Sequence, residues 1–478
     1  MRGTFKGRYI LAIILGLMSF FWIRTPSIAE QSALQTGKHK AHSGRRIEPS
    51  AFKYLGAFRL PGGNIPPRTF AYGGNAMTFN PDGDPGGSAD GFPGSLFIMG
   101  HDRQAWGTLP DGNQVAEVKI PAPTISKNLK TLPQAAFIQG FHDVAFGHFS
   151  ELEEIPRVGM HYLNHPATGP KIHLCWGQHM QFDETASHAW FNPTLKEPDF
   201  QGTWFIGKES LYSVNGYLFG IPEEWADAYT GGRYLATGRM RDGGWSGCGP
   251  ALFAYRPWID GKGNPAPSGT RLVGATLLRY ESTFAGPFVR ERSMNGYQHS
   301  DEWEGGAWLT TPSGRSAVLF AGTKGTGAKY WYGWVNPAGP EYPCVEKESL
   351  GQFTLCHLAD GRPCPKEDLA GCRNHNDFRG WWSSEFQAQL VLYDPSELAQ
   401  VASGKLQSWE PQPYARIVID SHLFHNPDHV EADMLGTGRQ RRYRIGDVAY
   451  DRRKGHLFVL ELFADGAKPV VHVWKVQD

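Results

Sequence analysis

The 478-residue sequence has no excess of charge of either sign, because lysine and arginine together number 47 and aspartate and glutamate also number 47. It therefore lacks the basic balance of a nucleic-acid-binding protein and the like-charge run of an acidic tail. It also lacks helix-length amphipathic patterns, apart from short pieces such as "PEEWADAY" and "DPSELAQVASG". These absences exclude nucleic acid as an expected partner and argue against a helical bundle.

Long apolar runs are also missing, except at the N-terminus. Three basic residues precede "YILAIILGLMSFFWI", and Ser27 and Ala29 follow it as the small residues that a signal peptidase requires. A run of about 15 residues is shorter than the ~20 that cross a bilayer as a helix, although an uncleaved anchor is the alternative. We predict a signal peptide at 1–29, cleaved after Ala29, and a flexible lead-in at 30–48. The mature protein is then secreted or periplasmic, with no membrane span.

Cysteine is scarce, with six residues in the chain. Exported proteins can keep disulfides, and the simplest arrangement joins Cys175 to Cys248 and forms two local bridges among the remaining four. The connectivity of those four is undetermined, and they are Cys344, Cys356, Cys364 and Cys372. A zinc site is the alternative, but the C-x-x-C spacing typical of such sites is missing. We predict that these cysteines staple an insertion at about 325–380 into a flap over the functional face.

Glycine and aromatic residues are abundant, with 58 glycines and an aromatic share of 13%, a composition that favours β structure over helices. Short apolar runs recur between breaks rich in Gly, Pro and Asp, as in a series of short strands. Five of these runs align as equivalent third strands: "SLFIMGH", "KIHLCWGQ", "RYLATGRM", "SAVLFAGTK" and "HLFVLELF". Each has a second strand before it and a fourth after it, and first strands such as "YLGAFRLP" and "AAFIQGF" are less clear.

Five groups of four strands predict an all-β fold, a β-propeller of four-stranded blades, as one domain over 49–478. A blade cannot bury both of its faces alone, so each packs against the next and the ring closes. Six or seven blades are the alternative if some blades are degenerate. A double-sheet sandwich would not require this fivefold spacing.

Polar residues follow the third strand of every group. Because the strands of a blade alternate in direction, loops after strands one and three leave on one face, and loops after strands two and four leave on the other. The same register point places on one rim His101, Gln178 with His179, Arg239, Lys324 and Glu461. We expect this to be the functional face, since long loops on a rigid scaffold usually carry function. Strand ends that merely turn into solvent are the simpler alternative.

Acids, bases and cations on one face suit the cleavage of a saccharide. A glycosidase uses two carboxylates, and a polysaccharide lyase uses a base with a cation that neutralises a uronate carboxylate. The catalytic candidates are His101, Asp102, His179, Arg239, Lys324 and Asp301. Further carboxylates expected on this face are Asp143, Asp242, Glu302, Glu304 and Glu461.

Flat aromatic rings and a second arginine on the same face suit the binding of sugar rings. The candidates for substrate binding are Trp245, Tyr297, Trp303, Trp331, Tyr332 and Arg241. Packing between blades or under loops is the alternative role of the aromatic residues.

Histidines beside carboxylates also suggest a divalent metal, zinc or calcium, as a possible cofactor. The candidate ligands are His101, His142, His179 and His299. No H-E-x-x-H motif supports the site, and hydrogen bonding within loops is the more ordinary role of such histidines.

The blade pattern resembles that of secreted bacterial β-propellers, which include five- to seven-bladed glycosidases and polysaccharide lyases. The resemblance covers nearly all of residues 50 to 478 as architecture, and no family motif matches residue by residue. It implies an exported enzyme acting on a saccharide, hydrolase or lyase, with a saccharide or other small molecule as its partner. The alternative is a non-catalytic propeller of the cell envelope that binds carbohydrate or protein.

Overall fold

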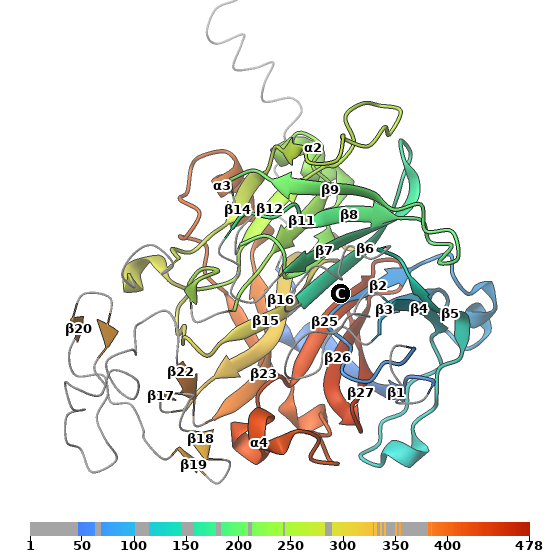
Figure 1. Cartoon of the computed structure of the whole chain (residues 1–478), viewed down its shortest axis with the longest axis vertical. Coiled ribbons are helices and arrows are strands. Elements are labelled where there is room, and N and C mark those ends of the chain that lie inside the picture. The colour runs from blue at the N-terminus through green and yellow to red at the C-terminus, as the bar shows by residue number, and fades with distance from the viewer. Residues whose placement is uncertain are drawn as a thin grey trace, which may run out of the picture. The chain divides into compact units, whose positions relative to one another are not determined.

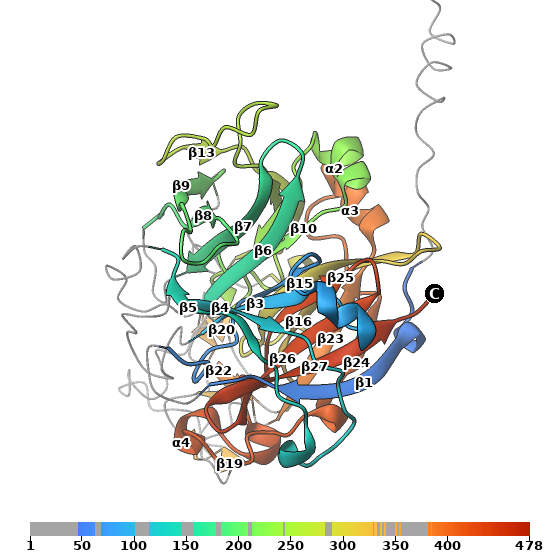
Figure 2. The same cartoon turned by 90° about the vertical axis from the view of Figure 1, so that its right-hand side faces the viewer.

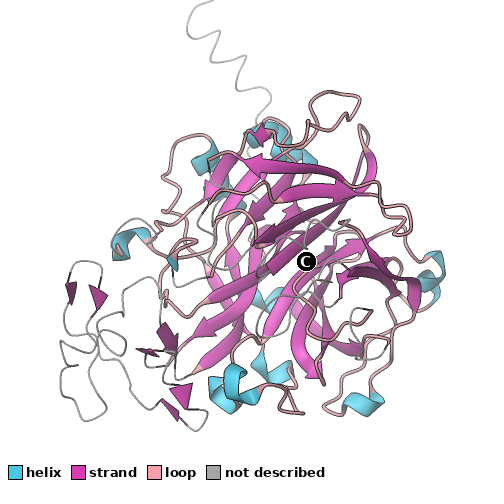
Figure 3. Ribbon diagram, viewed as in Figure 1, coloured by secondary structure: helices cyan, strands magenta, loops and turns pink. Residues whose placement is uncertain are grey.

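Strands make up most of the regular structure, as Figure 3 shows. The computed structural model describes residues 46–62, 68–100, 114–145, 157–177, 183–208, 213–241, 244–282, 289–327, 329–331, 335–336, 339–340, 349–350, 353–354, 381–383 and 385–478. The predicted signal peptide and almost all of the lead-in lie outside these residues.

Five sheets of mainly antiparallel strands follow one another along the chain, which confirms a five-bladed β-propeller. From the axis outward, blade 1 contains β2 (Met77–Asn80), β3 (Ser95–Met99), β4 (Gln114–Lys119) and β5 (Phe137–Asp143). Blade 2 contains β6 (Arg157–His165), β7 (Gly169–Gly177), β8 (His188–Phe191), β9 (Gln201–Ile206) and, parallel to β9, β13 (Arg271–Leu272). Blade 3 contains β10 (Tyr217–Gly220), β11 (Leu235–Gly238), β12 (Leu252–Tyr255) and β14 (Ala275–Leu278).

The last two blades complete the ring. Blade 4 contains β15 (Glu302–Thr310), β16 (Ser316–Gly325), β23 (Phe386–Tyr393) and β24 (Ala415–Val418). Blade 5 contains β25 (Ile445–Asp451), β26 (His456–Asp465), β27 (Lys468–Val476) and, as its outer strand, β1 (Phe52–Arg59). The innermost strands β2, β6, β10, β15 and β25 contact one another in this order, and β25 contacts β2 again.

Strand β1 closes the ring by pairing antiparallel with β27, from Phe52 opposite Val476 to Arg59 opposite Val470. Figures 1 and 2 show the blue N-terminal strand beside the red C-terminal one. The strands grouped from the sequence are real, but the grouping is wrong by one strand, because each predicted first strand is the outer strand of the preceding blade. Sequence order is the same in both groupings, so only the pairing of the outer strands, such as β5 with β4 and β1 with β27, distinguishes them.

Helices are few and short, and α2 (Glu223–Thr230) and α3 (Pro395–Ala402) lie where the sequence predicted helical pieces. Helix α3 begins with Pro395, and the Asp394 carboxylate accepts a hydrogen bond from the Ser396 amide, an ordinary N-terminal cap. The other short elements are α4 (Ala432–Leu435), β17 (Lys329–Trp331), β18 (Val335–Asn336), β19 (Gly339–Pro340), β20 (Ser349–Leu350), β21 (Phe353–Thr354) and β22 (Trp381–Ser383). In the part of the chain that the structure describes, no helix is long and apolar enough to cross a membrane.

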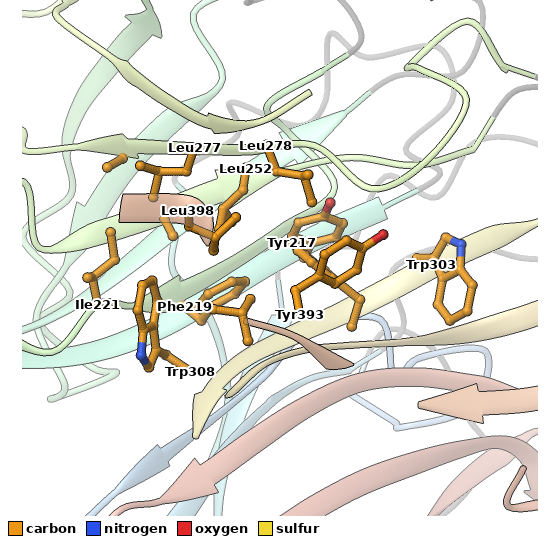
Figure 4. Close-up of a cluster of buried hydrophobic side chains, with 14 of the residues drawn as sticks. Tyr217, Phe219, Ile221, Leu252, Leu277, Leu278, Trp303, Trp308, Tyr393 and Leu398 are labelled. Carbon is orange, nitrogen blue, oxygen red and sulfur yellow. The ribbon is translucent and has the colours of Figure 1, made fainter. Parts of the chain in front are cut away.

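A separate apolar cluster fills each of the five junctions between neighbouring blades. Figure 4 shows the cluster between blades 3 and 4, where Tyr217 and Phe219 of β10 lie near Trp308 and Tyr393. Strand β3, "SLFIM", is buried at every position because its two faces contribute to two different junctions. Continuous apolar strands are therefore expected wherever a sheet is covered on both sides.

The inner strands all run in the same direction along the axis, and this defines two faces. We call upper the face with the loops that enter the inner strands and the loops that join second to third strands. The lower face has the hairpins that leave the inner strands. The upper face is the functional face expected from the sequence, because a shift of one strand in the grouping leaves the alternation of loops unchanged.

The predicted bridge between Cys175 and Cys248 is wrong. Both residues are buried, and neither takes part in a disulfide. Cys175 packs in the cluster between blades 2 and 3, where burial raises the pKa of its thiol to about 12. A buried cysteine of this kind behaves as a small apolar residue. The four clustered cysteines of the insertion lie outside the described residues, so the stapled flap stays a prediction.

We expect Phe58→Ala to destabilise the protein by about 3–5 kcal/mol, because Phe58 is fully buried where β1 closes the ring. Urea unfolding followed by tryptophan fluorescence measures this change. The matched control is Phe137→Ala, which removes a phenylalanine that is 38% exposed on another outer strand and costs about 1 kcal/mol or less. Equal losses of unfolding free energy in the two variants would contradict a closure of the ring that depends on β1.

Candidate functional site

Several of the predicted site residues cannot be placed. His101, Asp102, His179 and Tyr332 lie outside the described residues. Trp331 ends β17, but its side chain is not described. Their roles stay predictions, and the site is built below from the remaining candidates and their neighbours.

The upper loops of blades 3 and 4 meet beside the axis. The Trp303 amide donates a hydrogen bond to the Met240 carbonyl oxygen at 3.0 Å. This backbone bridge brings Arg239 and Arg241, which flank Met240, next to the start of β15. Arg239 is fully buried, and its Nη1 donates to Asn215 Oδ1 at 3.1 Å. The structure therefore joins candidates from two blades into one connected group.

Asp301 and Lys324 form a buried ion pair in blade 4, with 2.9 Å between Oδ1 and Nζ. Lys324 Nζ also donates to the Gly325 carbonyl oxygen at 2.6 Å, while Asp301 accepts from the amides of Gly325 and Gln298. Burial raises the pKa of Asp301, and the Lys324 charge opposes this shift. The pair fixes the chain at the start of β15, since a buried carboxylate must be compensated in this way.

The aromatic candidates of this region are buried. Trp303 is 2% exposed and packs in the cluster between blades 3 and 4, so its ring contributes to the core. Trp245 is likewise buried. Tyr297 lies against the same cluster, and its hydroxyl is 3.1 Å from His299 Nδ1. A hydroxyl bonded to an imidazole is an arrangement through which a proton can pass.

Polar side chains occupy the upper end of the inner strands in four of the blades. They are Asn75, Asn215, Glu304 and Asp447, each at least 97% buried. None of them stands in a local motif, and Asp447 is a functional candidate that the sequence reasoning missed. The available signal was their position near the start of an innermost strand, because Asn75 and Asn215 lie two residues before β2 and β10, and Glu304 and Asp447 are the third residues of β15 and β25.

Asp447 connects three blades at this point. Its Oδ2 accepts from the Met77 amide of blade 1 and its Oδ1 from the Val448 amide, each at 2.8 Å, while Gly305 of blade 4 packs directly against it. Burial raises the pKa of Asp447 well above its ordinary value, and the nearby Glu304 carboxylate raises it further. The hydrogen bonds from the Met77 and Val448 amides oppose this shift, and the net effect favours the protonated form of Asp447.

Charged side chains next to this pair are compensated. Glu302 Oε1 accepts from Arg442 Nη2 at 3.1 Å, which links β15 to the loop that enters β25. Arg444 in the same loop donates to Asp420 Oδ1 at 2.7 Å and to backbone carbonyl oxygens. Cations from blades 3 and 5 thus lie at the upper end of the axis, near the start of β15.

Glu461, predicted to lie on the rim, anchors the loop 419–444. Its carboxylate accepts from the amides of Phe424 and His425 at 2.7–2.9 Å and from His472 Nε2 at 2.8 Å. The Tyr54 hydroxyl lies 2.9 Å from the other ring nitrogen of His472. The chain of contacts runs from β1 through β27 and β26 to the upper loop, so Glu461 is a positioning residue.

The described part of the predicted metal site consists of His142 and His299. His142 lies on β5, the outer strand of blade 1, while His299 precedes β15 in blade 4. Among the described residues, no group of three or more His, Cys, Asp or Glu side chains could hold a metal ion. His299 is buried beside Tyr297, an ordinary hydrogen-bonding arrangement.

No protein-family model matches this chain, and no curated protein matches it in sequence. The fold therefore rests on the five sheets and their closure, and the function rests on the geometry of the upper face.

We expect Glu461→Gln to lower the free energy of unfolding by about 3 kcal/mol, because an amide leaves buried N–H groups without an acceptor. Limited proteolysis should then cut within 419–444. The control is Glu385→Gln, which removes a half-exposed carboxylate paired with the exposed Arg439 and changes stability by about 0.5 kcal/mol or less. An uncut loop in the folded Glu461 variant would contradict the anchoring role.

We expect Asp447→Asn to remove a pH dependence of stability. The folded protein holds a proton on Asp447 above the ordinary aspartate pKa of about 4, so the unfolding free energy of the wild type falls as pH rises. The difference in unfolding free energy between the wild type and the variant, measured by urea titration, should therefore shrink between about pH 5 and pH 8. Asp260→Asn, at a carboxyl whose pKa is lowered by hydrogen bonds to Asn264, should show no such change in this range. A difference in unfolding free energy between the wild type and the Asp447 variant that stays constant over this pH range would contradict the raised pKa.

Proposed function

We propose that the protein is an exported β-propeller enzyme that acts on a saccharide, as a glycoside hydrolase or polysaccharide lyase, at the upper end of the axis. The observation that carries the proposal is the pair of carboxyl groups of Glu304 and Asp447, buried near each other at the upper end of the axis, where burial raises the pKa of Asp447. Pairs of acids held in different protonation states are the means by which glycosidases combine a general acid with a base or nucleophile.

In the hydrolytic reaction, Asp447 gives its proton to the glycosidic oxygen as the bond from that oxygen to the anomeric carbon breaks. Glu304 either attacks the anomeric carbon or takes a proton from the attacking water. Asp447 regains a proton at the end of the cycle, and water is consumed in the net reaction. Arg239 and Arg442 are the cations that we assign to compensate the carboxylate that each step leaves behind.

In the lyase reaction, a base removes the proton next to a uronate carboxylate and the glycosidic oxygen leaves with a proton from an acid. Arg239 is the cation available to neutralise the uronate, and Asp447 is the available acid. His101 and His179 are the predicted bases. Hydrolase and lyase differ in the product, which is saturated in the first and carries a carbon–carbon double bond in the second.

Non-catalytic saccharide binding by the upper loops is the second candidate, because the buried groups proposed for catalysis could instead have a structural role. Arg239, Glu304 and Asp447 are each at least 98% buried, and both Asp447 oxygens already accept backbone hydrogen bonds. Groups with these contacts also suit a structural ring that fixes the upper loops.

The test is a screen of the purified protein against neutral and uronate-containing polysaccharides, with reducing ends and unsaturated products both measured. Glu304→Gln and Asp447→Asn should each lower turnover by about 10²–10⁴-fold. The control Glu385→Gln, on the same face, should keep full activity. Turnover retained in both site variants would overturn the assignment of these residues, and saccharide binding with no turnover in the wild type would establish the second candidate.

A further inference from the structure

A cavity of about 330 Å³ opens at the lower end of the axis. The second halves of all five inner strands and the hairpins that follow them line it. Its upper limit is apolar, with Met77, Met160, Leu218 and Val448 all buried. Glu304 and Asp447 are not among the residues that line this cavity, so it is a different site from the one proposed above.

Arg452 presents a guanidinium group to this cavity. One nitrogen, Nη2, donates to the Gly220 carbonyl oxygen at 2.5 Å, and no described carboxylate lies within 4 Å of the group. Its neighbour Arg453 differs, because Arg453 is 3.5 Å from Asp82 and 69% exposed. Burial lowers the pKa of Arg452 to about 10, which leaves it charged at neutral pH. The residue as a whole is nevertheless exposed toward the cavity, so its remaining N–H groups are accessible to an anion that enters.

The remaining polar groups of the cavity are suited to hydroxyl groups. His161 packs against Gly220, the residue whose carbonyl oxygen Arg452 contacts, and burial together with the Arg452 charge lowers the pKa of His161 to about 3. A neutral imidazole has one donor and one acceptor nitrogen. Asn164, Asp82 and Glu223 line the same space and add amide and carboxylate groups. Such a set of donors and acceptors binds sugar hydroxyls in both directions.

We propose that the lower cavity binds a small sugar acid, a monosaccharide of the uronate class, with its carboxylate on Arg452 and its hydroxyls on His161 and Asn164. One unpaired guanidinium matches one carboxylate, which it can bind through two parallel hydrogen bonds. The acidic side chains of Asp82, Glu223 and Asp451 disfavour a phosphate or sulfate, which brings more negative charge and no hydroxyl donors. The volume lies at the small end of ligand sites, as a single sugar ring requires.

The inference does not depend on the upper site. It names a ligand for the other end of the axis, where the sequence places plain turns such as "DRRKG".

The test is isothermal titration of the wild type with D-galacturonate and, as its neutral match, D-galactose. Galacturonate should bind saturably at one site, and galactose at least about tenfold more weakly. Arg452→Gln should weaken galacturonate binding about tenfold or more, with Arg452→Lys in between. The matched control is Lys454→Gln, which removes an exposed cation from the same hairpin outside the cavity and should leave binding unchanged.

Equal binding of the two sugars, no saturable binding of galacturonate, or unchanged affinity in Arg452→Gln would overturn the proposal. Asn164→Ala, at an exposed position, gives a second test if Arg452→Gln does not fold, and it should weaken binding of both sugars. Glu304→Gln separates this site from the proposed enzyme, because galacturonate binding should be unchanged in it even if catalysis is lost.

Discussion

The packing of apolar blade faces against one another is the interaction on which this molecule depends. A sheet that is apolar on both faces, such as the one containing β3, cannot be stable in water by itself. Each blade is covered only because it has a neighbour on either side, and the first and last blades have one only because β1 pairs with β27. In the closed ring the inner strands run parallel to one another. Their starts therefore meet at the upper end of the axis and their ends at the lower end.

The way in which charged groups near the axis are compensated follows from this arrangement. A carboxyl group at the upper end of an inner strand is surrounded by other strands, so it must find backbone N–H groups or a cation. Asp447 accepts from two amides and Glu461 accepts from the loop 419–444 and His472, while Asp301 pairs with Lys324. The same bonds that compensate these charges fix the loops in position, so stability and the geometry of the upper face have a common origin.

The fold class, the number of blades and the sorting of loops could be predicted from the sequence, because alternating strands and glycine-rich breaks recur with a fivefold period. The pairing of β1 could not, since an outer strand has the same pattern whichever blade it joins. Asp447 was missed because its partner Met77 is almost a whole chain length away, and residues that meet by ring closure leave no local motif. The bridge from Cys175 to Cys248 was wrong because cysteine counts do not tell which thiols lie close enough to bond.

The pairing of β1 with β27 has a consequence for how the protein is made. During synthesis the first strand of the ring emerges long before the last, and its partner does not exist until the chain is complete. Four blades can stack as they appear, but the final junction forms only after a loop spanning nearly the whole polypeptide has closed, which costs chain entropy and makes the step slow. Until then β1 and the outer faces of the end blades stay open to other molecules, so the interval before closure is the period in which aggregation threatens this chain most.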